Sequence, residues 1–519
     1  MTTRGEPTSD AWLRRLFFLL AVLYVVPFWT VRYLPTTDGP CHTYNAWVLR
    51  QHANVQEFPL FQQYYDVHLL PYPNWTGHAV MALLMFVVPP LIAEKLLVSG
   101  YVLLFLAGAW YLAGAVRPDQ RWPAFLAFFF PYNQVFQFGF YNFSISVALY
   151  LFVLSFWWRH RERPDLRFAV GINLLLWLCW FSHVLSFVLA LLSIAVLWLA
   201  TLRRATWRRH LLHVPILLPQ AGLPLWFFRA QGSETIPGTK PFRELLNFLV
   251  PPQALFSFSP LQLRLAAAVA AAFLVLAVLT LWRETLRRRD EPWPLPRQED
   301  AFLLLSALAT CLYFLAPEGM SGGYLVSPRL SLFPYLLLIP WLAPRLGPRW
   351  RGAGIAVLAV AALVNLGFLV HWYRELGEEV RQFVAGLEPV RPGSRVLSLL
   401  FRRNTGPANY ADVLSHATGY VALEKGLVDW DNYEAKVSFF PVRFRDGVQF
   451  PQLEGVTLGP GSLLVRRNLS TLDAVYTWKM PEDELLRRRL HRDYARVAER
   501  YGGELFERRP SPPAARNGG

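Results

Sequence analysis

The sequence predicts an α-helical multi-pass membrane protein that carries a small water-soluble α/β domain at its C-terminal end. The chain has 519 residues, of which 54% are apolar, and long uncharged runs of this kind are typical of polytopic membrane proteins. The apolar runs end near His371, and the remainder has the mixed composition of a soluble domain. We therefore expect a membrane domain over residues 1–371, a soluble domain over 372–508 and a disordered Pro-, Ala- and Gly-rich tail over 509–519.

Apolar segments suited to cross a bilayer recur along the membrane domain. The first follows Arg14 and Arg15, is too long for the core of a signal peptide and has no small-residue cleavage site after it. We therefore expect it to be retained as the first helix. Counting segments against bilayer thickness gives about eleven spans. They lie near residues 16–34, 96–116, 123–138, 142–158, 168–182, 184–200, 213–228, 262–282, 301–316, 330–344 and 352–371.

Arginine clusters between the apolar segments set the expected orientation. Lys and Arg are enriched in cytoplasmic loops. The clusters lie at Arg14–Arg15, Arg159–Arg167, Arg203–Arg209, Arg283–Arg289 and Arg345–Arg351. If the N-terminus is cytoplasmic and the ambiguous stretch 78–90 does not cross the membrane, all of these clusters lie in the cytoplasm. We therefore expect 78–90 to form a re-entrant or interfacial helix in a long first outer loop, residues 35–95, and the C-terminal domain to be extracytoplasmic. This topology also accounts for the net charge of +15, so no nucleic-acid partner is expected.

The C-terminal domain alternates strand-like and helix-like segments. Residues 395–400 follow a Pro-Gly turn and are expected to form a buried strand, as are residues 472–478. Residues 482–501 have helical spacing and end at two glycines, after which 504–508 is expected to resume as a strand. A small α/β domain fits this order.

Asp38 lies in a polar run directly after the first span, with His42 close behind it. Ionisable groups near a membrane interior often mark functional sites. Asp38 is a candidate general base or metal ligand, and His42 a candidate second base, ligand or phosphate contact. The alternative is structural, because Pro40 suits the first turn of a helix that Asp38 would then cap. Metal sites usually need three or more ligands, so this pair leaves a divalent metal open.

Other polar groups are expected on the same outer face. Arg329 is the only cation at an otherwise neutral outer helix start, where its planar donors suit phosphate oxygens, although snorkelling to lipid headgroups explains it equally well. Glu318 is a candidate partner of Arg329 or a second carboxylate, or else a solvated loop residue. His183 ends an apolar segment, where it is either functional or an interfacial residue with a backbone partner.

Amide side chains stand among aromatic residues between Pro131 and Asn142. An interfacial aromatic belt explains the aromatic residues but explains the amides less well. Asn133, Gln137 and Asn142 are therefore candidate contacts for a sugar or a lipid headgroup.

In these features the chain resembles the GT-C class of membrane glycosyltransferases. The acid in Thr37-Asp38-Gly39-Pro40-Cys41-His42, the long first outer loop, the number of spans and the outer soluble domain carry the resemblance. It implies an enzyme that transfers a sugar from a polyprenyl-phosphate-linked donor to an envelope glycan, lipid or protein at the outer face. Asp38 would match the catalytic or metal-binding acid of the class, and Arg329 its phosphate-holding basic residues. Many members carry two acids in this loop, whereas here Asp38 is followed by His42, so metal dependence stays open.

Three other functions compete with this interpretation. Transporters and flippases commonly show internal repeats, with glycine- or proline-broken helices at matching midplane positions. The sequence shows no such symmetry, and its polar residues are expected at one face rather than at mid-depth. The second alternative is a non-catalytic membrane scaffold with an outer binding domain. Only the expected convergence of polar residues on one face argues against it. A ligase or polymerase of envelope polysaccharide is chemically close to the first reading.

Overall fold

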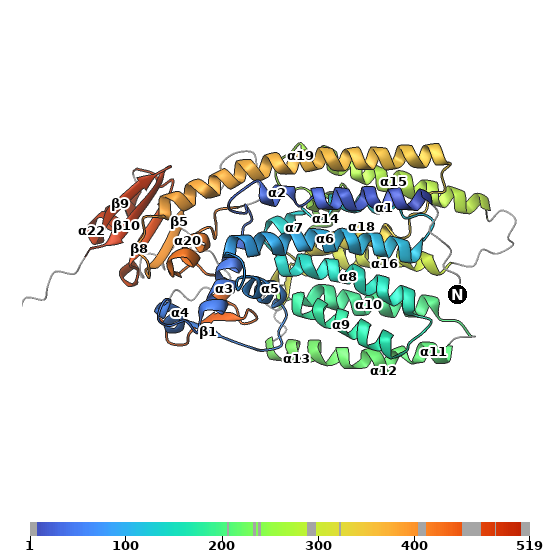
Figure 1. The fold of residues 1–519 in the computed structure, drawn as a ribbon, viewed down its shortest axis with the longest axis horizontal. Coiled ribbons are helices and arrows are strands. Elements are labelled where there is room, and N and C mark those ends of the chain that lie inside the picture. Colours follow the sequence, from blue (N-terminus) through green and yellow to red (C-terminus); the bar gives the residue numbers. More distant parts are fainter. Residues whose placement is uncertain are drawn as a thin grey trace, which may run out of the picture.

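The computed structural model describes residues 8–204, 207–231, 235–236, 240–287, 297–320, 323–402, 412–448, 469–482 and 484–509. A bundle of long, roughly parallel helices forms one part of the molecule, and a mixed α/β part sits at one end of it (Figure 1). Of the expected tail 509–519, the amide of Arg509 is bonded to the carbonyl oxygen of Asp493, and the other residues lie outside the described part.

Among the described residues, eight helical segments are long and apolar enough to cross a membrane. They are Ala11–Trp29, Pro90–Val116 (α6), Tyr141–His160 (α8), Val184–Thr201 (α10), Trp207–Ala230, Gln262–Trp282 in α15 (Gln262–Arg287), Gln298–Leu315 and Pro348–Leu387 (α19). The apolar helix α9, Leu166–Ser182, has 17 residues and falls just short. The prediction of a helical multi-pass membrane protein is confirmed, whereas the count of eleven spans is not.

Two expected spans are broken into short helices. Segment 123–138 forms the 3₁₀ helix η1, Trp122–Phe129, and α7, Gln134–Gln137; segment 330–344 contains α18, Leu332–Leu338, preceded by α17, Val326–Leu330. Proline lacks an N–H and clashes with the preceding turn, and prolines interrupt both segments. They are Pro123, Pro131, Pro328, Pro334, Pro340 and Pro344. Every residue of η1 is buried, so surrounding helices rather than lipid pack against it.

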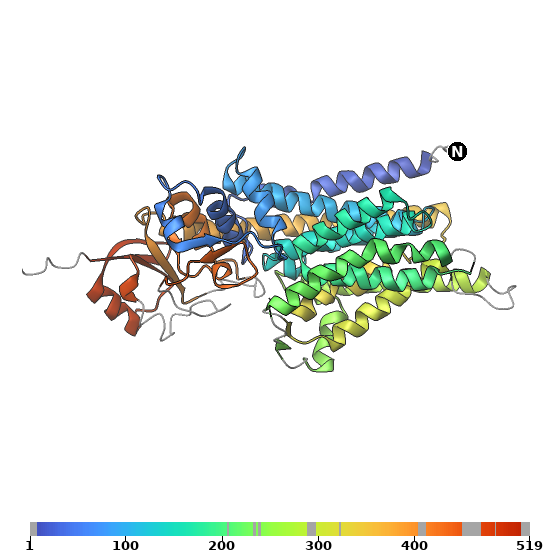
Figure 2. The same cartoon turned by 90° about the horizontal axis from the view of Figure 1, so that it is seen from below.

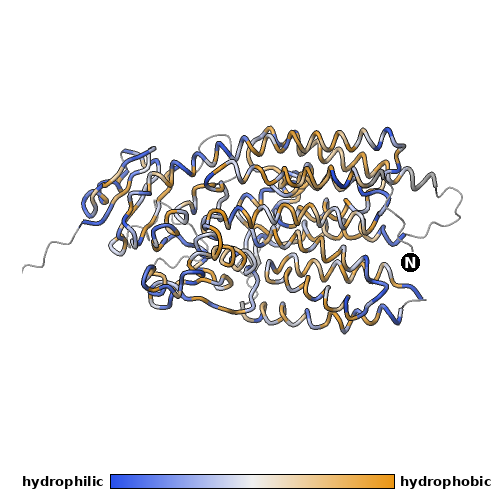
Figure 3. Tube along the Cα trace, in the orientation of Figure 1, coloured by the Kyte–Doolittle hydropathy of each residue, from blue (hydrophilic) through white to orange (hydrophobic). Residues whose placement is uncertain are grey.

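The ends of the bundle differ in chemistry. Arg117, after α6, pairs with Glu299, and Arg161, after α8, bonds to Gln298, so several Arg-rich loops meet at one end. The N-terminal end of the described chain lies at that end, and the α/β part lies at the other (Figure 1). Hydrophobic residues dominate the length of the bundle between them (Figure 3). The Arg-rich loops and the C-terminal domain therefore lie at opposite ends of the helix bundle, as the arginine pattern of the sequence predicts.

Helix α19 joins the bundle to the C-terminal domain without a break. It begins at Pro348, whose fixed φ suits the first helical turn, and continues for 40 residues, well past His371. At its far end the Phe383 ring packs edge-on against Tyr476 at 5.0 Å, and the Tyr476 hydroxyl donates to the Phe383 carbonyl. The expected boundary at residue 371 thus falls inside one helix.

A five-stranded mixed sheet forms the C-terminal domain, in the order β6-β5-β8-β10-β9. The central strands β5, Arg395–Leu400, and β8, Ala474–Trp478, are parallel, as suits a connection through the helix α20, Thr418–Lys425. The remaining strands are β6 (Val428–Asp429), β9 (Tyr494–Arg500) and β10 (Gly503–Arg508).

The expected helix 482–501 is wrong in its second half. Helix α22 ends at Asp493, and β9 follows it and pairs with β10 as an antiparallel hairpin. Tyr501 and Gly502 both have positive φ, of 55° and 80°, which is the backbone that a tight two-residue hairpin turn requires. The glycines therefore turn a hairpin rather than stop a helix.

The segment expected to form the first outer loop folds onto the C-terminal domain. It contains α3 (Gly39–Gln51), α4 (Pro59–Tyr64), β1 (Tyr65–Val67) and α5 (Thr76–Leu84), and β1 pairs with β7 (Val442–Phe444). Helix α20 lies so close to α3 that a Cβ on Gly419 would stand 2.6 Å from the Pro40 carbonyl oxygen. Both views show these segments side by side (Figures 1 and 2). The stretch 78–90 contains most of α5, a nine-residue helix that is too short to span a bilayer, and α6 starts at Pro90.

Candidate functional site

A cavity of about 710 Å³ lies where the bundle, the first outer loop and the C-terminal domain meet. Its polar lining includes Asp38, His42, Asn74, Asn142, His183, Arg329, Ser415, His416 and Tyr433. Its apolar lining includes Phe143, Val184, Leu185, Val188, Phe227, Phe228, Val326, Phe439 and Phe440. Concave, mostly apolar cavities with a few convergent polar groups are the usual form of small-molecule sites.

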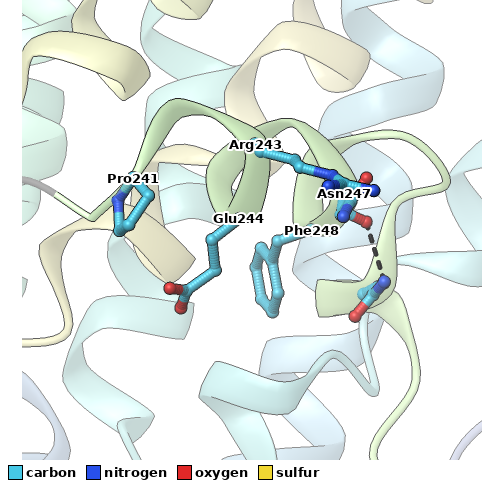
Figure 4. A pocket seen from close by; sticks show the side chains of 6 residues that line it. Pro241, Arg243, Glu244, Asn247 and Phe248 are labelled. Atoms are coloured by element: carbon cyan, nitrogen blue, oxygen red, sulfur yellow. Dashed lines mark hydrogen bonds between the residues drawn. The ribbon is translucent and has the colours of Figure 1, made fainter.

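A second hollow, of about 480 Å³, lies on the exposed helix α14, Phe242–Leu249 (Figure 4). Its carboxylate, Glu244, pairs with Lys240 at 2.8 Å, and Gln253 donates to the backbone of Asn247. None of the residues predicted for function lines it. The cavity where the bundle, the loop and the C-terminal domain meet, called the junction cavity below, is therefore the stronger candidate for a functional site.

The carboxylate of Asp38 faces the cavity instead of capping a helix. Asp38 occupies the N-cap position of α3 but makes no side-chain cap hydrogen bond. Its Oδ2 accepts from the Tyr433 hydroxyl at 2.9 Å, and its Oδ1 lies 3.6 Å from His416 Nε2. Burial raises the pKa of Asp38 to about 7, although the charge of His42 and the Tyr433 hydrogen bond oppose that rise. The group therefore changes charge near neutral pH, which suits a base.

Gly139 holds the backbone on which Asp38 sits. The Asp38 amide donates to the Phe138 carbonyl at 3.1 Å, and Gly139 has a φ of 87°. A Cβ there would stand 2.6 Å from the Asp38 nitrogen and 2.7 Å from that of Gly39, closer than packing allows. Only glycine meets both conditions without a shift of the loop.

Gly139→Ala should therefore destabilise the protein by about 1–3 kcal/mol, because it adds strain at positive φ to a backbone clash. Thermal unfolding of the purified protein in detergent measures this. Gly100→Ala, in α6 where nothing lies within 4 Å of an added Cβ, is the matched control and should not lower the melting temperature. Equal melting temperatures for the two variants would contradict the assignment.

Arg329 lies in the same cavity and has no carboxylate within ion-pair distance among the described residues. Its guanidinium stacks over the rings of Phe140 and Phe143, with 4.4 and 5.6 Å to the centroids. Burial lowers the pKa of Arg329 to about 10, so it stays charged at neutral pH. The predicted pair with Glu318 does not form; Glu318 lies outside the cavity lining and its Oε1 is buried without a hydrogen-bond partner.

His183 and Arg329 present two donors to one place. His183 Nδ1 accepts the Leu185 amide at 3.1 Å, so in the neutral ring Nε2 carries the proton. Burial, and then the charge of Arg329, hold the pKa of His183 well below its usual value, so the ring is neutral. Nε2 lies 3.3 Å from Arg329 Nη1, which is also only a donor. Both groups can be satisfied by one anionic oxygen between them.

His42 belongs to a buried group that the sequence does not reveal. Its Nδ1 contacts Glu434 Oε1, and His78 Nε2 lies 2.7 Å from Glu434 Oε2. Burial acts to raise the pKa of Glu434, but the adjacent His42 and His78 outweigh it and lower that pKa, so the carboxylate is charged at neutral pH. The ligand-type atoms of these three residues all lie within 4.8 Å of one another. Asp38 is not part of this group. The group therefore differs from the pair of Asp38 and His42 that the sequence offered as possible metal ligands.

The three predicted amides have different surroundings. Asn133 caps α7 by accepting the Phe136 amide, and Gln137 donates to the Tyr373 hydroxyl, both within the buried core. Asn142 does line the cavity, where its side chain accepts from Gly77 and donates to the Asn74 carbonyl. Asn133 and Gln137 thus shape the wall behind the site, and Asn142 alone reaches its surface.

The cavity and cluster residues that the sequence analysis did not predict include His78, His416, Tyr433 and Glu434. Tyr433 lies 395 positions from Asp38, and Glu434 lies 356 positions from His78. The run Asp429-Trp430-Asp431-Asn432-Tyr433-Glu434, dense in acids, amides and aromatic rings, was the only signal available.

No protein-family model matches this chain, and no curated protein matches it. Fold and site together define a multi-pass helical membrane protein with a mostly apolar cavity, lined by a few convergent polar groups, between its bundle and its C-terminal α/β domain.

Proposed function

We propose that this protein is a membrane glycosyltransferase that uses a polyprenyl-phosphate-linked sugar at the outer face of the membrane. The observation that carries the proposal is the pair of donors, Arg329 Nη1 and His183 Nε2, which lie 3.3 Å apart and share a cavity with the ionisable carboxylate of Asp38. An anion site and a base near its working pKa are the two parts that sugar transfer from a phosphate requires.

The apolar half of the cavity supports a lipid-linked donor. Val184, Leu185 and Val188 come from the start of α10, and Phe227 and Phe228 come from the end of the segment Trp207–Ala230. This wall begins beside His183, so an isoprenoid chain can lie against it while its phosphate meets Arg329.

In the proposed reaction, an acceptor hydroxyl oxygen attacks the anomeric carbon and forms the new glycosidic bond. The bond from that carbon to the phosphate oxygen breaks, and its electron pair leaves with the polyprenyl phosphate. Arg329 and the Nε2–H of His183 stabilise the charge on that oxygen. Asp38 takes the proton of the hydroxyl, and Tyr433 holds the carboxylate in place. Any divalent metal would belong near His42 and not on this path.

Reconstituted vesicles test the proposal directly. Purified protein is incubated with a panel of radiolabelled polyprenyl-phosphate hexoses and pentoses and with membrane glycolipid acceptors, and new glycosidic products are sought by chromatography. Loss of one envelope glycan from cells lacking the protein identifies the acceptor. Movement of the donor between leaflets without any new glycosidic bond would instead establish the transporter or flippase, and neither product nor movement would favour the scaffold.

The transfer rate should depend on pH through Asp38. A general base acts only when deprotonated, so kcat/KM should be low in acid and rise through pH 7 to a plateau, given the raised pKa of about 7. Tyr433→Phe removes a hydrogen bond that stabilises the charged carboxylate, so its profile should move to higher pH. Kinetics from about pH 5 to pH 9 measure both effects. A wild-type profile that is flat through neutrality would argue against Asp38 as base.

A further inference from the structure

The cluster of His42, His78 and Glu434 lies beside the cavity and is not used by the transfer chemistry. His42 comes from α3, His78 from α5 and Glu434 from η5, Glu434–Lys436, in the C-terminal domain. All are buried, with 4%, 0% and 0% of their surfaces exposed. Such a concentration of imidazole and carboxylate away from water needs a partner of some kind.

The hydrogen bond of His78 fixes which of its nitrogens faces Glu434. Its Nδ1 lies 3.2 Å from the Asn74 carbonyl oxygen, which can only accept, so Nδ1 carries the proton. His78 Nε2 faces Glu434 Oε2 only 2.7 Å away, so a proton or a metal cation lies between the two atoms. A histidine that donates its other N–H to a backbone carbonyl is the usual arrangement of a metal ligand.

His42 makes a second contact with Glu434. Its Nδ1 contacts Glu434 Oε1, yet neither atom has a partner in hydrogen-bond geometry. Glu434 Oε2 is already satisfied on another side by the Asn45 amide at 2.9 Å. Two imidazole nitrogens and one carboxylate therefore converge, and either protons or a metal cation must lie among them.

We propose that His42, His78 and Glu434 bind a divalent transition-metal ion, of which Zn²⁺ fits best. Two imidazole nitrogens with one carboxylate suit zinc, whereas Mg²⁺ and Ca²⁺ prefer oxygen ligands throughout. Because one ligand comes from the C-terminal domain and two from the first outer loop, the ion ties these two segments together beside the cavity. This site differs from an Asp38–His42 pair and does not depend on glycosyl transfer.

Metal content tests the proposal on the full-length protein. Protein purified without chelator in the presence of ZnCl₂ should contain about one zinc per chain by plasma mass spectrometry. A chelator should remove it and lower the melting temperature, and added ZnCl₂ should restore both. His78→Gln should lose the zinc, whereas His416→Gln, a buried cavity histidine outside the cluster, should keep it.

Cobalt gives a readout that does not require a folded variant. CoCl₂ added to the chelator-treated wild type should produce the visible absorption of four- or five-coordinate Co²⁺, and one equivalent of ZnCl₂ should abolish it. Wild-type protein without zinc whose melting temperature is unmoved by ZnCl₂, or zinc content unchanged in His78→Gln, would overturn the site. Such a result would leave proton-mediated contacts as the explanation of the cluster. Transfer activity is not the readout, so this failure is separable from that of the proposed function.

Discussion

Replacing Asp38 by asparagine should reduce glycosyl transfer by about 10²–10⁴-fold in kcat. The amide keeps the shape of the side chain and an oxygen for Tyr433, but it cannot take a proton from the acceptor hydroxyl. Transfer from radiolabelled polyprenyl-phosphate sugar in reconstituted vesicles measures the loss. Folding is checked by the melting temperature, which should stay close to that of the wild type.

Asp66→Asn is the control for Asp38. Asp66 lies in the same outer loop but is exposed and paired with Arg445 at 3.0 Å, outside the cavity. It should retain nearly full activity. Transfer by Asp38→Asn at the wild-type rate would return Asp38 to a structural role at the start of α3.

Replacing Arg329 by glutamine should lower kcat/KM by about 10²–10³-fold, the usual effect of removing one preorganised donor to a developing negative charge. Arg329→Lys should recover only part of this, because an ammonium lacks the planar pair of donors and cannot stack on Phe140 in the same way. Binding of a fluorescent polyprenyl phosphate to the purified protein gives a second, non-catalytic readout.

Arg243→Gln distinguishes phosphate binding from attraction to lipid headgroups. Arg243 is an exposed cation on α14, away from the junction cavity. If Arg329 only snorkelled to headgroups, both substitutions would have small and similar effects. A large loss confined to Arg329→Gln supports a specific phosphate site, whereas equal effects would contradict it.

Local composition was enough to predict the membrane helices that the structure contains. Val184–Thr201 has no charged residue, and Pro90–Val116 has only Glu94 and Lys95 near its start; bilayer thickness converts such apolar runs directly into helices of known length. The same local reading failed at 123–138 and 330–344, where apolar content is high but prolines break the helix. It also failed at 494–500, where pairing with β10 outweighed helical spacing.

Local features of the sequence do not predict which residues come together in the site. Asp38, His183 and Arg329 could be assigned to one face because each stands at the end of a span, and they do line one cavity. His78 and Glu434 gave no comparable signal, since each reads as an ordinary residue of its own segment.

The sequence alone determined the membrane class, the end of the bundle that holds the polar residues, and the choice of Asp38 and Arg329 as candidate site residues. It could do so because hydrophobicity and charge act segment by segment. The tertiary structure alone decided that the C-terminal domain completes the cavity with Tyr433 and His416, and that Glu434 joins His42 and His78. The reason is physical: these contacts arise from the packing of α20 on α3 and of β7 on β1, and such long-range packing leaves no periodic trace in either segment.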